Sequence, residues 1–162
     1  MTNKKNGDHR PSGPLRGGKY SLFEAGTRVP FFTYWNGKIK PGVSDSMVSQ
    51  LDLLSSLAQL VGSEVKTADS LPLLELLMGQ SDEGRDEMVI EATSRTAFKR
   101  GDWVMIPPYE GPAVNDKVQI ELGNDSDFQL YNLTEDIEQQ NNLAALKPVK
   151  LQEMLKAFEA IR

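Results

Sequence analysis

Apolar residues gather in separate stretches in the first half of the chain. Residues 29–35, Val-Pro-Phe-Phe-Thr-Tyr-Trp, are almost continuously apolar, which is typical of a strand covered on both faces, with the proline at its start. Farther along, apolar residues recur every three or four positions and predict a helix that begins at Ser44–Ser46 and ends before Gly62. The apolar stripe of this helix consists of Met47, Val48, Leu51, Leu54, Ala58 and Val61.

A second, shorter helix is predicted within residues 71–78. The polar residues 79–85 indicate a boundary between two subdomains. Beyond it, short apolar stretches at 88–93, 96–99, 103–106 and 128–132 predict strands, and residues 117–122 alternate as well. A last helix is predicted to begin at Pro148. Its apolar stripe consists of Leu151, Met154, Leu155, Phe158 and Ile161. The predicted fold class is therefore α/β in the first half, followed by an α+β part in which an antiparallel sheet is packed by a C-terminal helix.

Composition excludes several kinds of site. The chain has 162 residues, a formal net charge of −5, no cysteine and a single histidine. Disulfides, thiolate zinc sites and cysteine nucleophiles are therefore excluded. The sequence has no basic stripe with interleaved aromatic residues, so nucleic acid is not an expected partner. It also has no apolar run long enough to span a membrane. The polar N-terminus does not have the apolar core of a signal peptide.

One short motif suggests a binding site for an anion. Gly13, Gly18 and Lys19 have the spacing of a phosphate-binding P-loop. A P-loop also requires a serine or threonine after the lysine, where this chain has Tyr20, a buried strand before the loop and a helix after it. All three requirements fail. The glycines and the compact charge of Lys19 still suit an anion, and the alternative is an ordinary solvated lysine.

Residues 12–30 as a whole resemble the C-terminal signature of type I sulfatases, in which "GPLRGGK" is followed by a spacer, "EGG" and "RVP". Residues 35–42 resemble the "WPGKIKPG" that comes next, and residues 129–133 with 141–144 resemble "ELYDL…NLA". The sequence departs from the family pattern at three positions: Ala25 replaces the middle glycine of "EGG", Asn36 replaces the proline of "WPGKIKPG", and Ile137 stands where proline is usual. The ordered matches run from about residue 6 to the end, so the chain resembles the C-terminal portion of a bacterial arylsulfatase-like enzyme of the alkaline-phosphatase-like superfamily.

The resemblance implies a sulfuric ester hydrolase in which Lys19 contacts the sulfate group. It also implies that residues 1–82 complete the large α/β catalytic domain and that residues 83–162 form the small C-terminal subdomain. His9, ahead of the lysine loop, is a second candidate contact for sulfate or sugar, although a lone histidine in a polar loop is more often simply exposed. Glu24 and Arg28 are interpreted as residues that stabilise the turn into the predicted strand 29–35, and not as a catalytic acid or base.

Several parts of the family's catalytic site are missing from the sequence. The formylglycine nucleophile arises from a Cys/Ser-x-Pro-x-Arg motif, which this chain lacks, and the Asp and Asn ligands of the family's calcium ion lie upstream. We therefore expect no metal site in this chain and no sulfatase activity from the chain alone. Formylglycine and calcium are expected in the full-length family, and a sulfate ester would be a substrate only in that context. Periplasmic or secreted location is an expectation from the resemblance alone.

The sequence leaves the partner open. A complementing N-terminal catalytic part is one possibility. A homo-oligomer formed through the open apolar edge of residues 29–35 is another. The alternative function is a non-catalytic module, derived from the sulfatase fold, that binds anions or glycans or serves a structural role.

Overall fold

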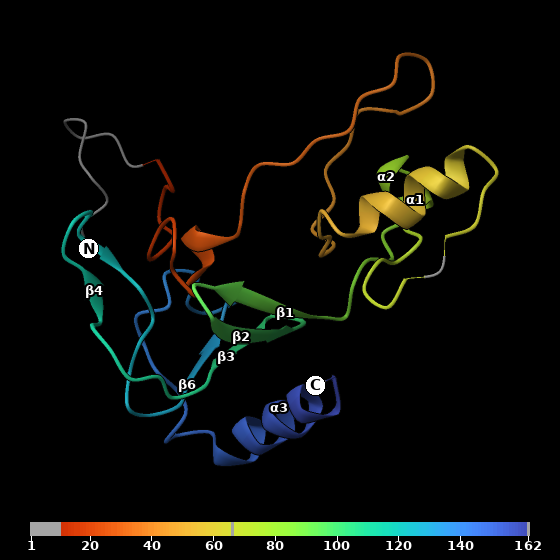
Figure 1. Cartoon of the computed structure of the whole chain (residues 1–162). Helices are drawn as coiled ribbons and strands as arrows, with labels where there is room; N and C mark the ends of the chain where they lie inside the picture. The colour runs from red at the N-terminus through yellow and green to blue at the C-terminus, as the bar shows by residue number, and fades with distance from the viewer. Residues whose placement is uncertain (1–10, 66, 162) are drawn as a thin grey trace. The chain divides into compact units, whose positions relative to one another are not determined.

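The computed structural model describes residues 11–65 and 67–161, and the chain divides into two compact units (Figure 1). The helical unit comprises Pro30–Asp86. The sheet unit combines the residues up to Val29 with Glu87–Arg162. The polar segment 79–85, predicted as a boundary, lies at the end of the helical unit. The assignment of 1–82 and 83–162 to two domains of a complete enzyme stays a prediction.

The sheet unit is built on a four-stranded antiparallel sheet with the order β1-β2-β3-β6. This confirms the strands predicted from the sequence. The turn between β1 and β2 consists of Thr93 and Ser94, which both have positive φ angles, and Gly101 at φ 53° lies in the predicted turn between β2 and β3. The strands are β1 (Glu87–Ala92), β2 (Arg95–Arg100), β3 (Trp103–Ile106) and β6 (Gln129–Asn132).

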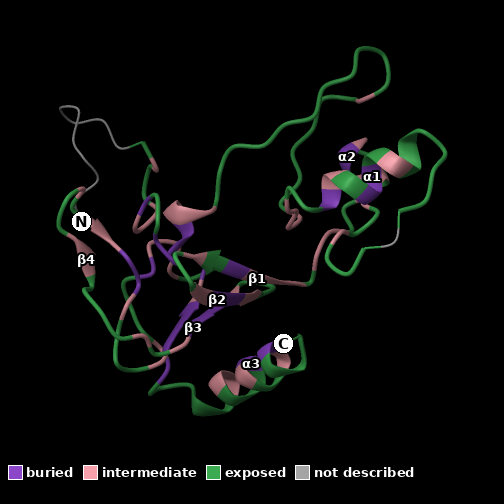
Figure 2. Ribbon diagram, viewed as in Figure 1, coloured by how far each residue is buried: buried purple, intermediate pink, exposed green. Residues whose placement is uncertain are grey.

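One face of this sheet is covered by the C-terminal helix α3 (Pro148–Ile161), as the sequence predicts. The strand register pairs Phe98 with Met105 and Met105 with Leu130, so these three side chains share the face. Met154 and Phe158 of α3 are buried against them, and the rings of Phe98 and Phe158 lie 5.8 Å apart between centroids. Figure 2 shows this division of α3 into a buried and an exposed side.

The opposite face of the sheet is covered by the segment that follows Lys19. Leu22 and Phe23 are buried there with residues of all four strands. Phe23 precedes a short 3-10 turn, η1 (Glu24–Gly26), and contacts Tyr131 edge to face at 6.1 Å between centroids. The sulfatase-like signature is therefore attached directly to the C-terminal sheet. A two-stranded ribbon of β4 (Val114–Asn115) and β5 (Ile120–Glu121) completes the unit, so only the end of the alternating stretch 117–122 forms a strand.

The helical unit contains α1 (Asp52–Leu60) and α2 (Leu74–Leu77). The predicted start of the first helix at Ser44–Ser46 is wrong, because the Ser46 hydroxyl donates instead to the carbonyl of Asp82. The chain turns into the helix at Ser49, whose N–H donates to Oδ2 of Asp52 at 2.8 Å. This contact resembles the return bond of a capping box. The predicted end at Gly62 is confirmed, since Gly62 has φ 72° and the following N–H donates back to Ala58.

The predicted buried strand over residues 29–35 is wrong. No strand forms there, and the segment is exposed, as its colour in Figure 2 shows. Phe32 is 85% exposed and Tyr34 86%. A continuously apolar strand is stable only when neighbouring strands satisfy its backbone and layers cover both faces. Among residues 11–65 and 67–161 no strand pairs with this segment. Among the described residues, this apolar segment therefore remains a surface without cover.

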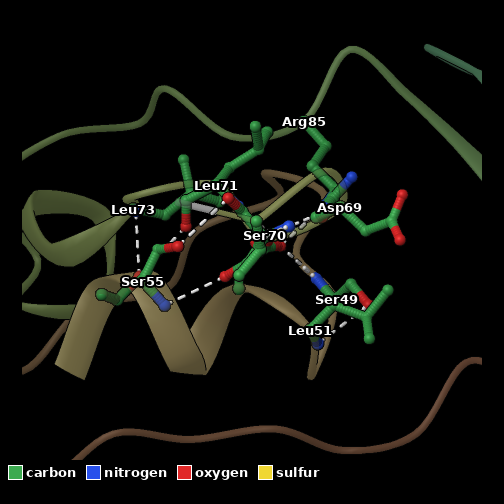
Figure 3. Close-up of polar contacts among 11 residues, drawn as sticks. Ser49, Leu51, Ser55, Asp69, Ser70, Leu71, Leu73 and Arg85 are labelled. Carbon is green, nitrogen blue, oxygen red and sulfur yellow. Dashed lines mark hydrogen bonds and ion pairs between the residues drawn. The ribbon is translucent and has the colours of Figure 1, made fainter. Parts of the chain in front are cut away.

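Helix α1 directs its polar side inward. Asp52, Ser55 and Ser56 are buried, and Figure 3 shows the polar contacts that Ser55, Ser70 and their neighbours make. Asp52 accepts hydrogen bonds from the N–H of Leu71 and from the guanidinium of Arg85. The exposed apolar residues of α1 and its end form what we call the leucine face: Leu51, Leu54, Leu57, Leu60 and Val61. In the part of the chain that the structure describes, no helix is both long and apolar enough to cross a bilayer.

Candidate functional site

Lys19 lies at the tip of a tight turn. The N–H of Ser21 donates to the carbonyl of Gly18 at 2.9 Å, so Lys19 and Tyr20 are the two central residues of this turn. Tyr20 has φ 78°, the angle that a type II turn requires at its third position. Gly18 is buried, whereas Lys19 is exposed. The element that follows the lysine is the three-residue η1 and not the α-helix that a P-loop requires, in agreement with rejection of the P-loop.

The glycines of the signature allow the chain to close around Ser21. A Cβ atom at Gly17 would lie 2.3 Å from the Ser21 hydroxyl, and one at Gly26 would lie 2.1 Å from the Ser21 carbonyl oxygen. Gly17 also has φ 84°, which favours glycine. The lysine turn therefore depends on both glycines for close backbone approach, which explains the residue types without reference to a ligand.

Arg16 ties the lysine loop to a distant part of the chain. Its Nη2 and Nε atoms lie 2.8 and 3.1 Å from the two carboxylate oxygens of Glu121 in β5. Nη1 donates to the carbonyl of Gln139 at 2.6 Å, and the guanidinium lies 4.1 Å above the ring of Phe23. Burial alone would lower the pKa of Arg16, but the hydrogen bond and charge of Glu121 raise it. Arg16 is therefore committed to a structural ion pair and is not free to bind an anion.

Glu24 is a buried structural residue and not an exposed acid or base. Its carboxylate accepts hydrogen bonds from Lys99 at 3.1 and 3.3 Å, and the Arg28 guanidinium lies 3.4 Å away. The N–H of Glu24 donates to the side-chain carbonyl of Gln139 at 2.8 Å. These bonds fix the turn after Lys19 to β2 and to the loop after β6, which agrees with the role inferred from the sequence.

Lys19 contacts the ring of the next residue, Tyr20, whose backbone in turn contacts a second cation, Arg95. The ammonium nitrogen lies 5.1 Å from the centroid of the Tyr20 ring. The Tyr20 carbonyl accepts a hydrogen bond from Nη2 of Arg95 at 3.3 Å, and Arg95 also donates to Asn124 and Thr93. Within the described residues, neither Lys19 nor Arg95 forms an ion pair with a carboxylate. Two positive charges without a carboxylate partner among the described residues thus border one turn, which suits an anionic ligand.

Sequence reasoning found Lys19 but missed Arg95. Arg95 is 75 residues from Tyr20 in the sequence, and only the antiparallel sheet brings the β1–β2 turn next to the lysine loop. His9, the other predicted contact, lies outside the described residues. The roles of Lys19 and His9 in binding sulfate stay predictions.

The described residues offer no set of ligands for a resident metal. No group of three or more His, Cys, Asp or Glu side chains that could hold a metal ion occurs among residues 11–65 and 67–161. We therefore assign these residues no step through calcium or formylglycine, and the expectation that this chain has no metal site stays a prediction.

Comparison with known proteins identifies the family. A family model described as Sulfatase matches residues 6–63. Over 158 residues the chain is 37% identical to the N-acetylgalactosamine-6-O-sulfatase of Bacteroides thetaiotaomicron, and this alignment covers 95% of the chain. This chain belongs to the sulfatase family. The sulfatase chain is also 46% identical to arylsulfatase A of Bos taurus over 70 residues, which cover 42% of the chain and 14% of that enzyme.

Solved structures agree with this assignment. A structure from work on the metabolism of multiple glycosaminoglycans by Bacteroides thetaiotaomicron matches with a TM-score of 0.90 and 36% identity, over 95% of this chain and 33% of that one. The PsFucS1 sulfatase from Pseudoalteromonas sp. matches with a TM-score of 0.72 at 20% identity, over 91% of this chain and 32% of that one, and shows the fold alone. The sulfatase chain spans about a third of the length of these relatives, 31% for the Bacteroides enzyme. It corresponds to the C-terminal portion of the family.

Proposed function

We propose that this chain supplies the C-terminal part of a hydrolase of sulfate esters and that Lys19 contacts the sulfuryl group. The observation that carries the proposal is the exposure and the unneutralised charge of Lys19 in the described part of the chain. Its ammonium is exposed at the tip of a braced turn and has no carboxylate partner among the described residues. The substrate that we propose is a sulfated amino sugar, because the relative with 37% identity is named for N-acetylgalactosamine 6-O-sulfate.

The chemistry of this proposal is charge stabilisation by a fixed group. Cleavage of the S–O bond increases negative charge on the sulfuryl oxygens and on the leaving oxygen. An ammonium held at that position stabilises the transition state more than the ground state. The bonds of Arg16, Glu24 and Gly18 hold the turn in place before the substrate arrives, so little reorganisation is required during the reaction.

The proposed partner is the N-terminal catalytic part of a sulfatase. Formylglycine and calcium, as the resemblance implies, would belong to that part, and the chain alone would then be inactive. The leucine face of α1 and the aromatic residues 31–35 support this partner, because both are apolar surfaces that the described chain leaves uncovered. A location outside the cytoplasm is proposed with it, from family resemblance.

The proposal is tested by sulfate release from N-acetylgalactosamine 6-sulfate. We expect no turnover by the 162-residue chain and measurable turnover by a chimera in which it replaces the corresponding segment of the Bacteroides sulfatase. Turnover by the chain alone would contradict the proposed dependence on a partner. A folded but inactive chimera would favour the second candidate, a non-catalytic anion-binding module. The charges of Lys19 and Arg95, which have no carboxylate partner in the described part of the chain, support this candidate.

A further inference from the structure

The turn that carries Lys19 holds Tyr20 in a backbone conformation that aromatic residues rarely adopt. Tyr20 has φ 78°, in the left-handed region where Cβ crowds the backbone. Glycine or asparagine would occupy this position of the turn without that strain. Strained residues persist where the surrounding structure holds them, and they gather at functional sites.

Arg95 is the residue that holds Tyr20. Its Nη2 donates to the Tyr20 carbonyl at 3.3 Å, and its guanidinium is fixed in turn by Thr93 and Asn124. Thr93 and Ser94, which join β1 to β2, also have positive φ angles of 50° and 65°. Two turns made of non-glycine residues in the left-handed region therefore meet at one guanidinium. Packing does not require this arrangement, because Arg95 is only half-buried and Tyr20 is exposed.

The ring of Tyr20 is the apolar surface next to the Lys19 ammonium. It is 43% exposed, and the ammonium lies 5.1 Å from its centroid, within the range of a cation–π contact. A sulfated pyranose carries the same two features side by side, an anionic sulfate and a ring face of C–H groups. Aromatic side chains offer a rigid surface for such contacts at low entropic cost.

We propose that Tyr20 is a sugar-contacting residue that recognises the pyranose ring of a sulfated carbohydrate beside Lys19, and that Arg95 is its positioning residue. The inference rests on the proposed function, because it takes Lys19 as the sulfate contact. It goes further by making recognition of the sugar a property of this chain. Binding of inorganic sulfate then requires Lys19 but not Tyr20, whereas binding of a sulfated sugar requires both Lys19 and Tyr20.

The test compares variants of the whole 162-residue chain in two measurements. Saturation-transfer NMR with N-acetylgalactosamine 6-sulfate reports on contact with the sugar ring protons, and thermal unfolding with inorganic sulfate reports on the anion site. We expect Tyr20→Gly and Tyr20→Ala to reduce transfer to the sugar about fivefold or more, and Tyr20→Phe to retain it. We also expect Tyr20→Gly to raise Tm by about 2–4 °C, because glycine relieves the strain, whereas Tyr20→Ala does not.

The outcomes separate this proposal from the one on which it rests. In Tyr20→Gly the stabilisation by inorganic sulfate should persist, and in Lys19→Ala it should disappear. Sugar binding by Tyr20→Gly equal to that of the wild type would overturn the role of Tyr20 and leave the sulfate site intact. Binding of 4-nitrophenyl sulfate through Tyr20 without binding of the sugar would also overturn it. If Lys19→Ala alone has no effect on either ligand, the proposed function fails instead.

Discussion

Arg16 and Glu121 form a two-bond ion pair across 105 residues of sequence, with Nη2–Oε1 at 2.8 Å and Nε–Oε2 at 3.1 Å. The pair joins the residue three positions before Lys19 to the last residue of β5. The hydrogen bond from Arg16 lowers the pKa of Glu121. This geometry, together with the bond from Arg16 to the Gln139 carbonyl, makes the arginine of the signature a structural residue that positions the lysine turn.

Replacement of Arg16 should therefore weaken folding of the sheet unit. We expect Arg16→Ala to lower the free energy of unfolding by about 2–3 kcal/mol, because it leaves the half-buried Glu121 carboxylate and the carbonyl of the buried Gln139 without their donor. Arg16→Lys should recover only part of this loss, since an ammonium cannot form both carboxylate bonds in the same geometry. Urea unfolding measures both, with the exposed Lys156→Ala as a control expected within about 0.5 kcal/mol of wild type. An equally small effect of Arg16→Ala would contradict the structural role.

The sequence predicted the parts of this molecule that depend on neighbours close in the chain. The β2–β3 hairpin, the short helix within 71–78 and the helix starting at Pro148 were correct, because turn chemistry and apolar periodicity determine such elements locally. Residues 29–35 were wrong as a strand, since strand formation there requires partners that the described chain does not provide. The contact between Arg95 and the lysine turn was missed, because only the sheet register creates it.

The same distinction applies to α1. Periodicity predicted a helix with an apolar stripe, and the structure confirms the helix from Asp52 onward, without Met47 and Val48. Leu51, Leu54 and Val61 of the stripe are exposed to solvent, and the polar side of the helix is buried. Hydrophobic periodicity shows which face of a helix can be covered, and it does not show whether the covering residues belong to the same part of the chain. The buried site of Asp52 and Arg85, 33 residues apart, had no signal in the sequence.

Because of Asp52, the helical unit should lose stability at acid pH. Burial by itself would raise its pKa, but hydrogen bonds from Arg85, Leu71 and Ser49 lower it below the ordinary value. A carboxyl group with a lowered folded pKa stabilises the native state above its unfolded pKa of about 3.9, and this stability is lost as pH falls through the folded pKa. We expect Asp52→Asn to be less stable than wild type from neutral pH to about pH 5, and the difference to narrow below about pH 4.

Chemical unfolding over this pH range measures the effect of Asp52. The exposed Asp45→Asn is the matched control, and its difference from wild type should stay small throughout. A stability difference between wild type and Asp52→Asn that does not change between neutral and strongly acidic pH would contradict the lowered pKa.

The leucine face should make the isolated chain self-associate. Exposed apolar side chains of α1 have no cover among the described residues, and burial in a second copy removes them from water. We expect Leu54→Asp with Leu57→Asp to reduce association in sedimentation velocity without loss of stability, because both side chains are exposed. Gln59→Asp adds a charge at an exposed position of the same helix that is not part of the leucine face, and should leave association unchanged. A wild-type chain that stays a monodisperse monomer at all concentrations would contradict this use of the face.

The charge of Lys19 is best tested within a complete active site. The measurement is kcat/KM for sulfate release from N-acetylgalactosamine 6-sulfate by the chimera with the Bacteroides sulfatase, before and after Lys19→Ala. Loss of one group that stabilises developing charge predicts a decrease of about 10²–10³-fold, with unchanged folding and with the exposed Lys147→Ala as active as the parent chimera. A Lys19→Ala chimera that retains activity within about twofold of its parent would contradict the claim that this lysine holds the sulfuryl group.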